Sequence, residues 1–205
     1  IPQLWFLSKP CVVNSSLIET ELGEFRVQYT KQGLARLQFP KTKIDRASNT
    51  IKPIKQWINQ TQKALNAILN GKNPKHYPPL DLSSGTDFQR GVWALLQSIP
   101  MGELEAYGDL AYRLNKPKAA RAVGGACRAN PIPILIPCHR VVGANGTLTG
   151  FSAGLNWKIR LLRAEGVELP LHWHAFARLI ASPPLSGMKY KDTLNLPQTG
   201  FPMKA

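Results

Sequence analysis

Residues 117–142 of the chain read PKAARAVGGACRANPIPILIPCHRVV. The second half of this stretch, from Asn130 to Val142, holds three prolines among isoleucine, leucine and valine. Because proline lacks a backbone N–H, such a segment cannot be an ordinary central strand. We expect an extended apolar segment that positions Cys138 and His139 at the entrance of a rigid channel from which water is excluded.

The residues that follow Cys138 make this cysteine a candidate nucleophile. A cysteine in an apolar stretch is most often an inert, buried side chain. Here His139 and Arg140 follow it directly. A thiolate forms at neutral pH only beside cationic or proton-accepting groups, and this pair could supply them. The pattern favours a reactive thiol, with a structural core cysteine as the alternative.

The first half of the stretch has helical spacing from Pro117 to about Ala129. One side of this helix is apolar and the other is basic and small; the apolar side holds Ala120, Val123 and Cys127, and the opposite face holds Arg121, Gly124, Gly125 and Arg128. Each glycine inside a helix costs about 1 kcal/mol relative to alanine. Close approach of a nucleic-acid groove would offset this cost. Tight helix packing with solvated arginines is the alternative.

Two further helices are predicted before this one. Thr86 and Gln89 have the spacing of a capping box, and the helix they begin should end before Pro100. A short helix follows, with Tyr107, Leu110, Ala111 and Leu114 on one face. A tight turn then leads to Pro117, so the two short helices predict a helix-turn-helix.

The last predicted helix follows a loop that runs from Gly143 to Gly154. It turns Leu155, Ile159 and Leu162 inward and ends at Gly166, with Glu165 in its final turn. A carboxylate at that end opposes the helix dipole. An exposed surface charge is the simpler interpretation of Glu165. The alternative is that Glu165 polarises a basic group in a site.

The N-terminal third predicts a small α/β unit. Phe25, Val27 and Tyr29 alternate with polar residues, and after a turn at Gly33 the same alternation returns over 35–39, which indicates a β-hairpin. From residue 54 the apolar spacing becomes helical until Gly71. The loop over 71–85 is rich in proline, glycine and serine, so we expect a domain boundary there.

Composition supports a globular protein with a polyanionic partner. The 205 residues are 43% hydrophobic and carry 26 Lys and Arg against 12 Asp and Glu, a net charge of +14 that is spread along the chain. Nucleic acid is the favoured partner. Three cysteines do not make a disulfide scaffold. No apolar run is long enough for a membrane helix, and we expect a cytoplasmic protein with no membrane association.

Several motifs together resemble the O6-alkylguanine-DNA alkyltransferases, the methylated-DNA–protein-cysteine methyltransferase family. The resemblance runs from about Glu19 to Gly166. It rests on TDFQRGVW (86–93), AYGDLA (106–111), AARAVGGA (119–126), NPIPILIPCHRVV (130–142) and GFSAGL (150–155). The PCHRV signature, preceded by RAVGG and NPxP at this spacing, is its most specific part.

The resemblance implies an α+β fold in two parts. Residues 1–82 would form a small α/β domain, ribonuclease H-like, with an antiparallel hairpin. Residues 83–168 would form a mostly helical, winged-helix-like domain with the helix-turn-helix and the alkyl acceptor. Residues 169–205 lie outside the resemblance, and we expect this extension to be disordered. Within that extension, 188–205 resemble the N-terminal start of isoleucyl-tRNA synthetase and are too short for its chemistry.

The implied activity is DNA repair by a single-turnover methyltransferase. Such proteins bind double-stranded DNA through the minor groove, flip the damaged guanine and transfer its alkyl group irreversibly to their own cysteine. Flipping is required because the O6 substituent cannot be approached inside the base stack. O4-alkylthymine is a second substrate class to consider. We expect a monomer and no cofactor.

Carried over by the resemblance, one set of residues performs the chemistry. Cys138 would be the nucleophile, His139 its water-linked base and Glu165 the carboxylate that orients this histidine. Asn130 would brace the active-site turn, and Tyr107 would donate its hydroxyl toward the guanine ring. Adjacent residues in an extended segment point opposite ways, so we expect a turn or a bridging water between the thiol and the imidazole.

A second set of residues would bind the DNA and the flipped base. Arg121 would fill the hole left by the base, on a face shared with Ala120, Gly124, Gly125 and Arg128. The alkylguanine would lie against Tyr107, Val141, Phe151, Ser152 and Ala153; the Ser152 N–H would donate to the O6 region, and the carbonyls of Cys138 and Val141 would accept from the exocyclic amine.

Some positions depart from the family pattern. Ala153-Gly154 replaces Gly-Gly, and the added methyl would narrow the pocket, so methyl is the favoured adduct and benzyl a poor one. Phe151 replaces a tyrosine. No zinc site is predicted, because Cys11 and His76 are the only soft ligands of the N-terminal part and His172 and His174 have no further ligands nearby.

Three other functional classes remain open. An alkyltransferase-like protein would flag lesions without repairing them, but such proteins carry another residue at the position of Cys138. The unusual ends of the chain could mark a degraded gene. A cysteine hydrolase is the weakest alternative, because its base usually comes from a residue distant in sequence.

Overall fold

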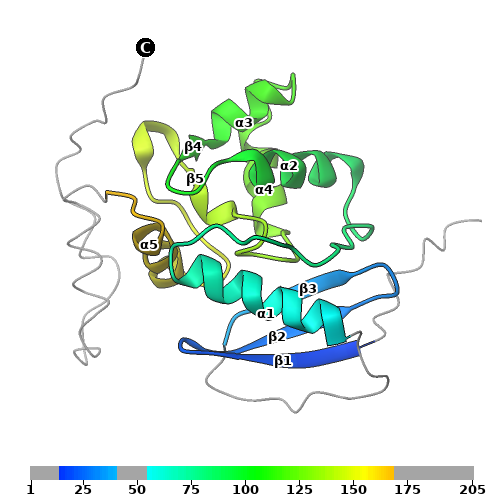
Figure 1. The fold of residues 1–205 in the computed structure, drawn as a ribbon. Helices are drawn as coiled ribbons and strands as arrows, with labels where there is room; N and C mark the ends of the chain where they lie inside the picture. Colours follow the sequence, from blue (N-terminus) through cyan, green and yellow to red (C-terminus); the bar gives the residue numbers. More distant parts are fainter. Residues whose placement is uncertain (1–13, 41–54, 169–205) are drawn as a thin grey trace, which may run out of the picture.

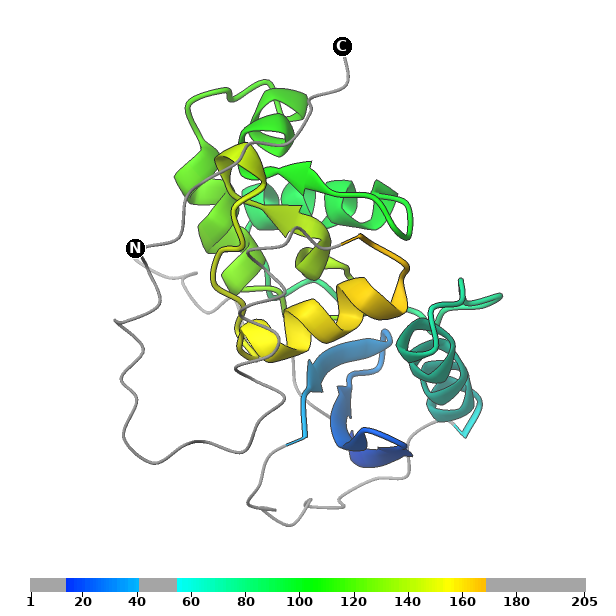
Figure 2. The ribbon, with the colours of Figure 1, turned by 90° about the vertical axis from the view of Figure 1, so that its left-hand side faces the viewer.

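The computed structural model describes residues 14–40 and 55–168. A three-stranded sheet with one helix, α1, forms one end of the molecule, and helices α2, α3 and α4 form the other (Figure 1). In the view turned by 90°, helix α5 runs between the sheet and the upper helices (Figure 2). The α+β architecture predicted from the sequence is confirmed.

The sheet contains the predicted hairpin and one additional strand. Strands β1 (Asn14–Thr20), β2 (Gly23–Tyr29) and β3 (Leu34–Gln38) pair antiparallel in the order β1-β2-β3. Strand β1 was not predicted, because its two apolar residues, Leu17 and Ile18, are adjacent in sequence and show no alternation, although only Ile18 is buried. Gly33 makes the turn between β2 and β3, where a Cβ would lie only 2.3 Å from the Pro79 carbonyl oxygen.

Helix α1 (Lys55–Leu69) confirms the helix that the apolar spacing predicted, and it packs against the sheet (Figure 1). Its buried residues are Thr61, Ala64, Leu65 and Ile68. The hydroxyls of Tyr29 and Thr61 share a buried hydrogen bond of 2.8 Å, which connects the sheet to the helix. Gly71 follows the helix with a φ of +67°, a left-handed conformation that favours glycine at this position.

The loop after α1 crosses the end of the sheet before the second helical unit begins. Leu34 donates its N–H to the Pro79 carbonyl and accepts from the N–H of Asp81, both at 2.8 Å. The Thr30 hydroxyl donates to the buried Asp81 carboxylate at 2.5 Å. One hydrophobic cluster runs from Phe25 in β2 to Leu161 in α5. A domain boundary at residue 82 therefore stays a prediction.

The helix-turn-helix is present with a small change of bounds. Helix α2 (Asp87–Ser98) begins with the predicted capping box between Thr86 and Gln89. Helices α3 (Tyr107–Arg113) and α4 (Ala120–Arg128) follow and pack against each other. The prediction that α4 starts at Pro117 is wrong, because residues 117–118 still form a turn and the helix begins three residues later.

A short parallel strand pair joins two distant parts of this unit. Strand β4 (Glu105–Ala106) pairs with β5 (Val141–Val142). The pairing brings the start of α3 beside the residues that follow the PCHR motif. Two 3-10 turns, η1 (Cys138–Arg140) and η2 (Ala144–Gly146), flank β5, and α5 (Leu155–Ala164) completes the described fold.

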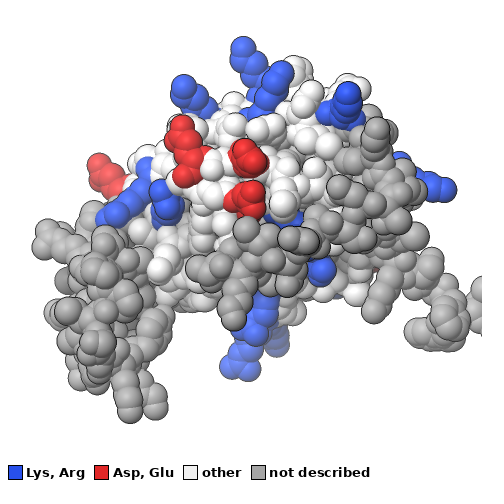
Figure 3. Space-filling view, turned by 90° about the horizontal axis from the view of Figure 1, so that it is seen from below, with Lys and Arg blue, Asp and Glu red and all other residues white. Residues whose placement is uncertain are grey.

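The described surface carries charges of both signs. Seen from below, lysine and arginine side chains are distributed around this face and acidic side chains lie among them (Figure 3). Within residues 14–40 and 55–168, no helix is both long enough and apolar enough to span a membrane.

Candidate active site

The proline-rich segment before Cys138 is a closed turn, so the prediction of an extended stretch is wrong. Asn130 holds both ends of this turn: its Oδ1 accepts from the Ile132 N–H at 3.0 Å, and its Nδ2 donates to the Ile136 carbonyl at 2.8 Å. Ile134 has a φ of +76°, which is rare for a β-branched residue. The prolines exclude a regular strand, and the Asn130 amide supplies the hydrogen bonds that close the chain instead.

This turn places Cys138 in a buried position at the start of η1. The side chain is 5% exposed, and its Sγ accepts a hydrogen bond from Asn130 Nδ2 at 3.2 Å. Burial raises the pKa of Cys138 to about 11, although the Asn130 hydrogen bond and the charge of Lys158 oppose this shift. At neutral pH the resting group is therefore a thiol, which needs a proton acceptor before it can react as a nucleophile.

His139 lies next to the thiol in sequence and contacts Glu165. Its Nε2 is 2.9 Å from Glu165 Oε1, and both side chains are completely buried. Burial lowers the pKa of His139, although Glu165 opposes the shift, so the imidazole is neutral at pH 7. Its Nδ1 is buried and has no hydrogen-bond partner among the described residues. The expected absence of a direct bond between Cys138 and His139 fits this geometry.

Arg140 gives Glu165 a second set of contacts. Arg140 Nε and Nη2 donate to the two carboxylate oxygens at 2.9 and 2.8 Å, and Nη1 donates to the Ile99 carbonyl at 2.6 Å. Burial alone would raise the pKa of Glu165, but the hydrogen bonds from His139 and Arg140 bring it down to about 2. The surface-charge interpretation of Glu165 is wrong. Arg140, which the sequence suggested as a cation beside the thiol, pairs with Glu165.

Tyr107 reaches the same region from the start of α3. Its hydroxyl shares a hydrogen bond of 3.0 Å with the Thr149 hydroxyl, in the loop that precedes α5. Burial raises the pKa of Tyr107, and the Thr149 hydrogen bond opposes the shift. A neutral phenol is therefore available as a donor. The pairing of β4 with β5 is what brings this side chain toward the Cys138 segment.

Lys158 is a further buried group that the sequence analysis missed. Its side chain is fully buried in α5, and its Nζ donates to the Val141 carbonyl at 2.6 Å and to the Thr149 carbonyl at 3.4 Å. Lys158 stands between Leu155 and Leu162 at helical spacing, on the inward side of the predicted helix. A lysine within an apolar stripe was the signal that could have identified it.

The predicted DNA-binding face of α4 is exposed and carries little bulk. Arg121, Gly125 and Arg128 are exposed, whereas Ala120 and Gly124 are half-buried. A Cβ at Gly125 would meet no described atom within 4 Å, and one at Gly124 would make an ordinary contact of 3.8 Å with the Tyr107 ring. Packing within the described chain therefore does not require these glycines, contrary to the tight-packing alternative.

The loop before α5 holds the remaining predicted substrate contacts. The Phe151 ring packs edge-on against Phe39 with centroids 5.7 Å apart. Ser152 is exposed and Ala153 is half-buried. Gly154 has a φ of +91°, so glycine is favoured at this position, whereas Ala153 has no such requirement. Cys127 lies on the buried side of α4, as predicted.

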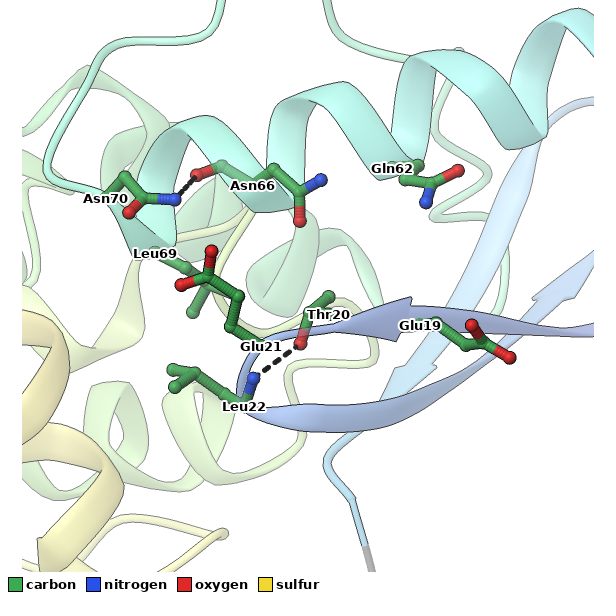
Figure 4. Close-up of a pocket in the computed structure, with 8 residues that line it drawn as sticks. All are labelled: Glu19, Thr20, Glu21, Leu22, Gln62, Asn66, Leu69 and Asn70. Atoms are coloured by element: carbon green, nitrogen blue, oxygen red, sulfur yellow. Dashed lines mark hydrogen bonds between the residues drawn. The ribbon is translucent and has the colours of Figure 1, made fainter.

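A separate cleft lies in the N-terminal unit and contains none of these residues. It is formed by the β1–β2 turn and the side of α1, and its lining includes Glu19, Glu21 and three carboxamides from Gln62, Asn66 and Asn70 (Figure 4). In this view the Glu19 and Glu21 carboxylates point in different directions. The cleft is polar and belongs to another part of the molecule.

In ranges 14–40 and 55–168, no group of three or more His, Cys, Asp or Glu side chains is placed to hold a metal ion. His76 is exposed. Cys11, His172, His174 and the segment over 188–205 lie outside the described residues.

Comparisons with known proteins agree on one family. Residues 87–167 match the model described as 6-O-methylguanine DNA methyltransferase, DNA binding domain. The chain is 37% identical over 153 residues to a methylated-DNA–protein-cysteine methyltransferase of Methanosarcina acetivorans, a match that covers 74% of this chain and 97% of that protein. The Salmonella typhimurium protein of the same name is 57% identical over 87 residues, which cover 42% of this chain and 51% of the relative.

A solved structure shows the same similarity in three dimensions. The crystal structure of Mycobacterium tuberculosis OGT in complex with DNA superposes with a TM-score of 0.65 and 37% sequence identity. The superposition covers 75% of this chain and 94% of that one.

Proposed function

Because the chain belongs to the methylated-DNA–protein-cysteine methyltransferase family, we propose that it repairs O6-alkylguanine in DNA by moving the alkyl group onto Cys138. The observation that carries this assignment is the position of Cys138: a buried thiol held by Asn130, beside a buried His139–Glu165 pair. A nucleophile, a base and a group that orients the base are the parts that nucleophilic catalysis requires.

His139 takes the proton from the thiol in this mechanism. With its Nε2–H donating to Glu165, His139 keeps a lone pair on Nδ1, the buried nitrogen that has no described partner. One water between Nδ1 and Sγ would satisfy this atom and carry the proton. Because the resting pKa of Cys138 is about 11, proton removal has to accompany the attack.

The transfer itself needs only the protein and the DNA. The sulfur forms a bond to the alkyl carbon as the bond from that carbon to O6 breaks, and guanine leaves with the electron pair. Tyr107 donates its hydroxyl toward the guanine as negative charge develops on it, an interaction that strengthens in the transition state. The product is a thioether on Cys138, so each protein molecule reacts once.

The exposed face of α4 is the surface proposed for the minor groove of double-stranded DNA. Gly124 and Gly125 let the backbone approach the groove, while Arg121 and Arg128 carry positive charge beside them. Arg121 would occupy the space of the flipped base. The complex of Mycobacterium tuberculosis OGT with DNA supports DNA as the partner.

The flipped base would lie between Tyr107, the Val141 carbonyl and the loop over 150–154. The carbonyls of Cys138 and Val141 accept from the exocyclic amine, and the Ser152 N–H donates near O6. Phe151 would provide a stacking face, and the Ala153 methyl would narrow the space for the alkyl group. We therefore expect O6-methylguanine to react faster than O6-benzylguanine.

Intact-protein mass spectrometry tests the proposal. The protein is incubated with a DNA duplex that carries one O6-methylguanine, and we expect a gain of one methyl group that saturates at one per chain. Lesion-selective binding with no gain in mass would contradict the transfer and point to a damage-recognition protein. If the protein shows no lesion-selective binding and no gain in mass, both the transfer and the recognition of damage are contradicted.

A further inference from the structure

Lys158 is a buried cation without a carboxylate partner. Its side chain has no exposed surface, and of the carboxylates in the described ranges none pairs with its ammonium group. By contrast, the neighbouring buried cation Arg140 is paired with Glu165. Desolvating an ammonium group is unfavourable unless other groups compensate it. Core packing does not explain a buried lysine of this kind, because methionine would fill the same space without a charge.

The contacts of Lys158 join the two sides of the proposed guanine site. Its Nζ donates to the Val141 carbonyl in β5, three residues after the nucleophile, at 2.6 Å. The same nitrogen lies 3.4 Å from the carbonyl oxygen of Thr149 in the loop before α5. The Thr149 hydroxyl is in turn bonded to Tyr107. One ammonium group thus connects the carbonyl that would accept from the base and the residue that holds the phenol.

We propose that Lys158 is a positioning residue for alkyl transfer: its ammonium group, bonded to the Val141 and Thr149 carbonyls, fixes these two segments at one spacing and places a positive charge within the site. This inference rests on the proposed function. A carbonyl oxygen has two lone pairs, so Val141 can accept from Lys158 and from the exocyclic amine together. The lysine would hold this oxygen in the direction that the base requires.

The electrostatic part of the inference depends on which groups surround Lys158. The groups whose charges interact with that of Lys158 are Cys138 and His139 in η1 and Cys127 on α4, and Tyr107 on α3 interacts with both thiols. All four are neutral at rest, since burial raises the pKa of the two thiols and of Tyr107 and lowers that of His139. When Cys138 gives up its proton, the thiolate becomes the anion near the ammonium group.

The charge of Lys158 should itself titrate in an accessible range. Burial lowers its pKa to about 8, although the two thiols oppose the shift. The ammonium group is therefore charged below about pH 8 and neutral above it. If the charge assists the reaction, the rate constant for transfer falls as the pH rises through this value.

Lys158→Met tests the inference, because methionine fills a similar volume without a donor or a charge. We expect the single-turnover rate constant for O6-methylguanine in duplex DNA to fall about tenfold to hundredfold. We also expect the fall above pH 8 to disappear, while affinity for undamaged duplex stays unchanged. Arg160→Met is the matched control: it removes an exposed cation from the same helix and should keep the wild-type rate and pH profile.

Other outcomes separate the failure of this inference from that of the proposed function. Wild-type protein that transfers no methyl group contradicts the proposed function itself. If the wild-type protein is active and the Lys158→Met variant is equally fast, the role of Lys158 is overturned. The same holds if the variant slows only in proportion to its loss of folded protein. If the methionine variant does not fold, Lys158→Gln replaces it: its amide can still donate but carries no charge, so loss of the pH effect is again expected and its persistence contradicts the inference.

Discussion

Charged side chains are buried around Cys138 but exposed on the outer face of α4. Beside the thiol, the charged groups Arg140, Lys158 and Glu165 are all buried and hydrogen-bonded. On α4, Arg121 and Arg128 extend into solvent. The first region has its geometry before any partner arrives, whereas the second has groups that become useful only in a complex.

This difference suggests that chemistry and recognition rest on separate residues. A prebuilt, buried centre needs little rearrangement when the reaction begins. Exposed arginines beside a bare helix backbone can adapt to a phosphate backbone and a groove. Substitutions should therefore be able to remove one property and leave the other.

Cys138→Ala should have the largest effect of any single substitution. It removes the acceptor atom, so we expect no methyl transfer at any concentration, with binding to damaged duplex retained because α4 is unchanged. Radiolabelled methyl transfer and a gel-shift assay measure the two properties. Cys127→Ala is the control and should retain transfer. A Cys138→Ala protein that still removes the methyl group from DNA would contradict the mechanism.

Glu165→Gln should be the next largest change, and we expect it to lower stability as well as to disturb the orientation of His139. It leaves Arg140 buried without its counter-charge, which we expect to lower the free energy of unfolding by about 3 kcal/mol. Chemical denaturation measures this value. Glu105→Gln, which breaks a partly exposed pair with Arg113, should cost about 1 kcal/mol or less. Equal effects of the two substitutions would contradict the importance of the buried network.

The same carboxylate should make the stability of the protein depend on pH. Its pKa in the folded protein is about 2, below the ordinary value of 4.5. A carboxyl group whose pKa is lowered by folding stabilises the fold at pH values above its pKa in the unfolded chain. This contribution is lost as the pH falls from about 4.5 toward 2. The Glu165→Gln variant should show a shallower loss of stability over this range, measured by denaturation at several pH values.

Arg121→Ala should have an intermediate effect that belongs to recognition alone. We expect transfer from a lesion in duplex DNA to slow about tenfold, because the space of the flipped base is no longer filled, at a cost near 1–2 kcal/mol. Transfer from the free base O6-methylguanine, which needs no flipping, should keep its rate. Arg36→Ala on β3 is the charge-matched control. Equal slowing with both substrates would remove the role assigned to Arg121.

Gly125→Ala should produce the smallest change and sharpen the comparison most. Because its Cβ would meet no described atom, better helix propensity should stabilise the fold by about 1 kcal/mol. The same methyl group should weaken binding to duplex DNA if the backbone lies against the groove. Gly91→Ala in α2 should give a similar gain in stability with unchanged DNA affinity. Tighter DNA binding by Gly125→Ala would contradict the proposed surface.

Local patterns predicted much of the fold because local chemistry produces it. The alternation around Phe25, Val27 and Tyr29 gave the hairpin, and the capping box at Thr86 gave the start of α2. The turn before Cys138 was predicted wrongly, because the prolines indicate only what the segment cannot be. The turn is closed by the Asn130 side chain and by a backbone hydrogen bond from Ile136 to Ile132. The family resemblance pointed to Asn130, but not to its partners.

The parts that sequence patterns missed depend on contacts between distant residues. Strands β4 and β5 are two residues long each, too short for any alternation, and lie 36 residues apart. From its place in the last helical turn alone, Glu165 was interpreted as an exposed charge, because its partners His139 and Arg140 are more than 20 residues away. Only the family resemblance pointed to His139 as a partner of this carboxylate. The nucleophile could be predicted from a motif in the sequence. The hydrogen bonds among His139, Arg140 and Glu165 form only when the chain folds.

The most direct test of the account is to find which cysteine carries the methyl group. Protein that has reacted with O6-methylguanine duplex is digested, and the peptides that contain Cys127 and Cys138 are compared by mass spectrometry. We predict one methyl group on Cys138 and none on Cys127, since the Asn130 side-chain amide donates to Cys138 Sγ and His139, which pairs with Glu165, directly follows Cys138 in the chain. A methyl group on Cys127, or one shared between both thiols, would contradict the assignment of the active site.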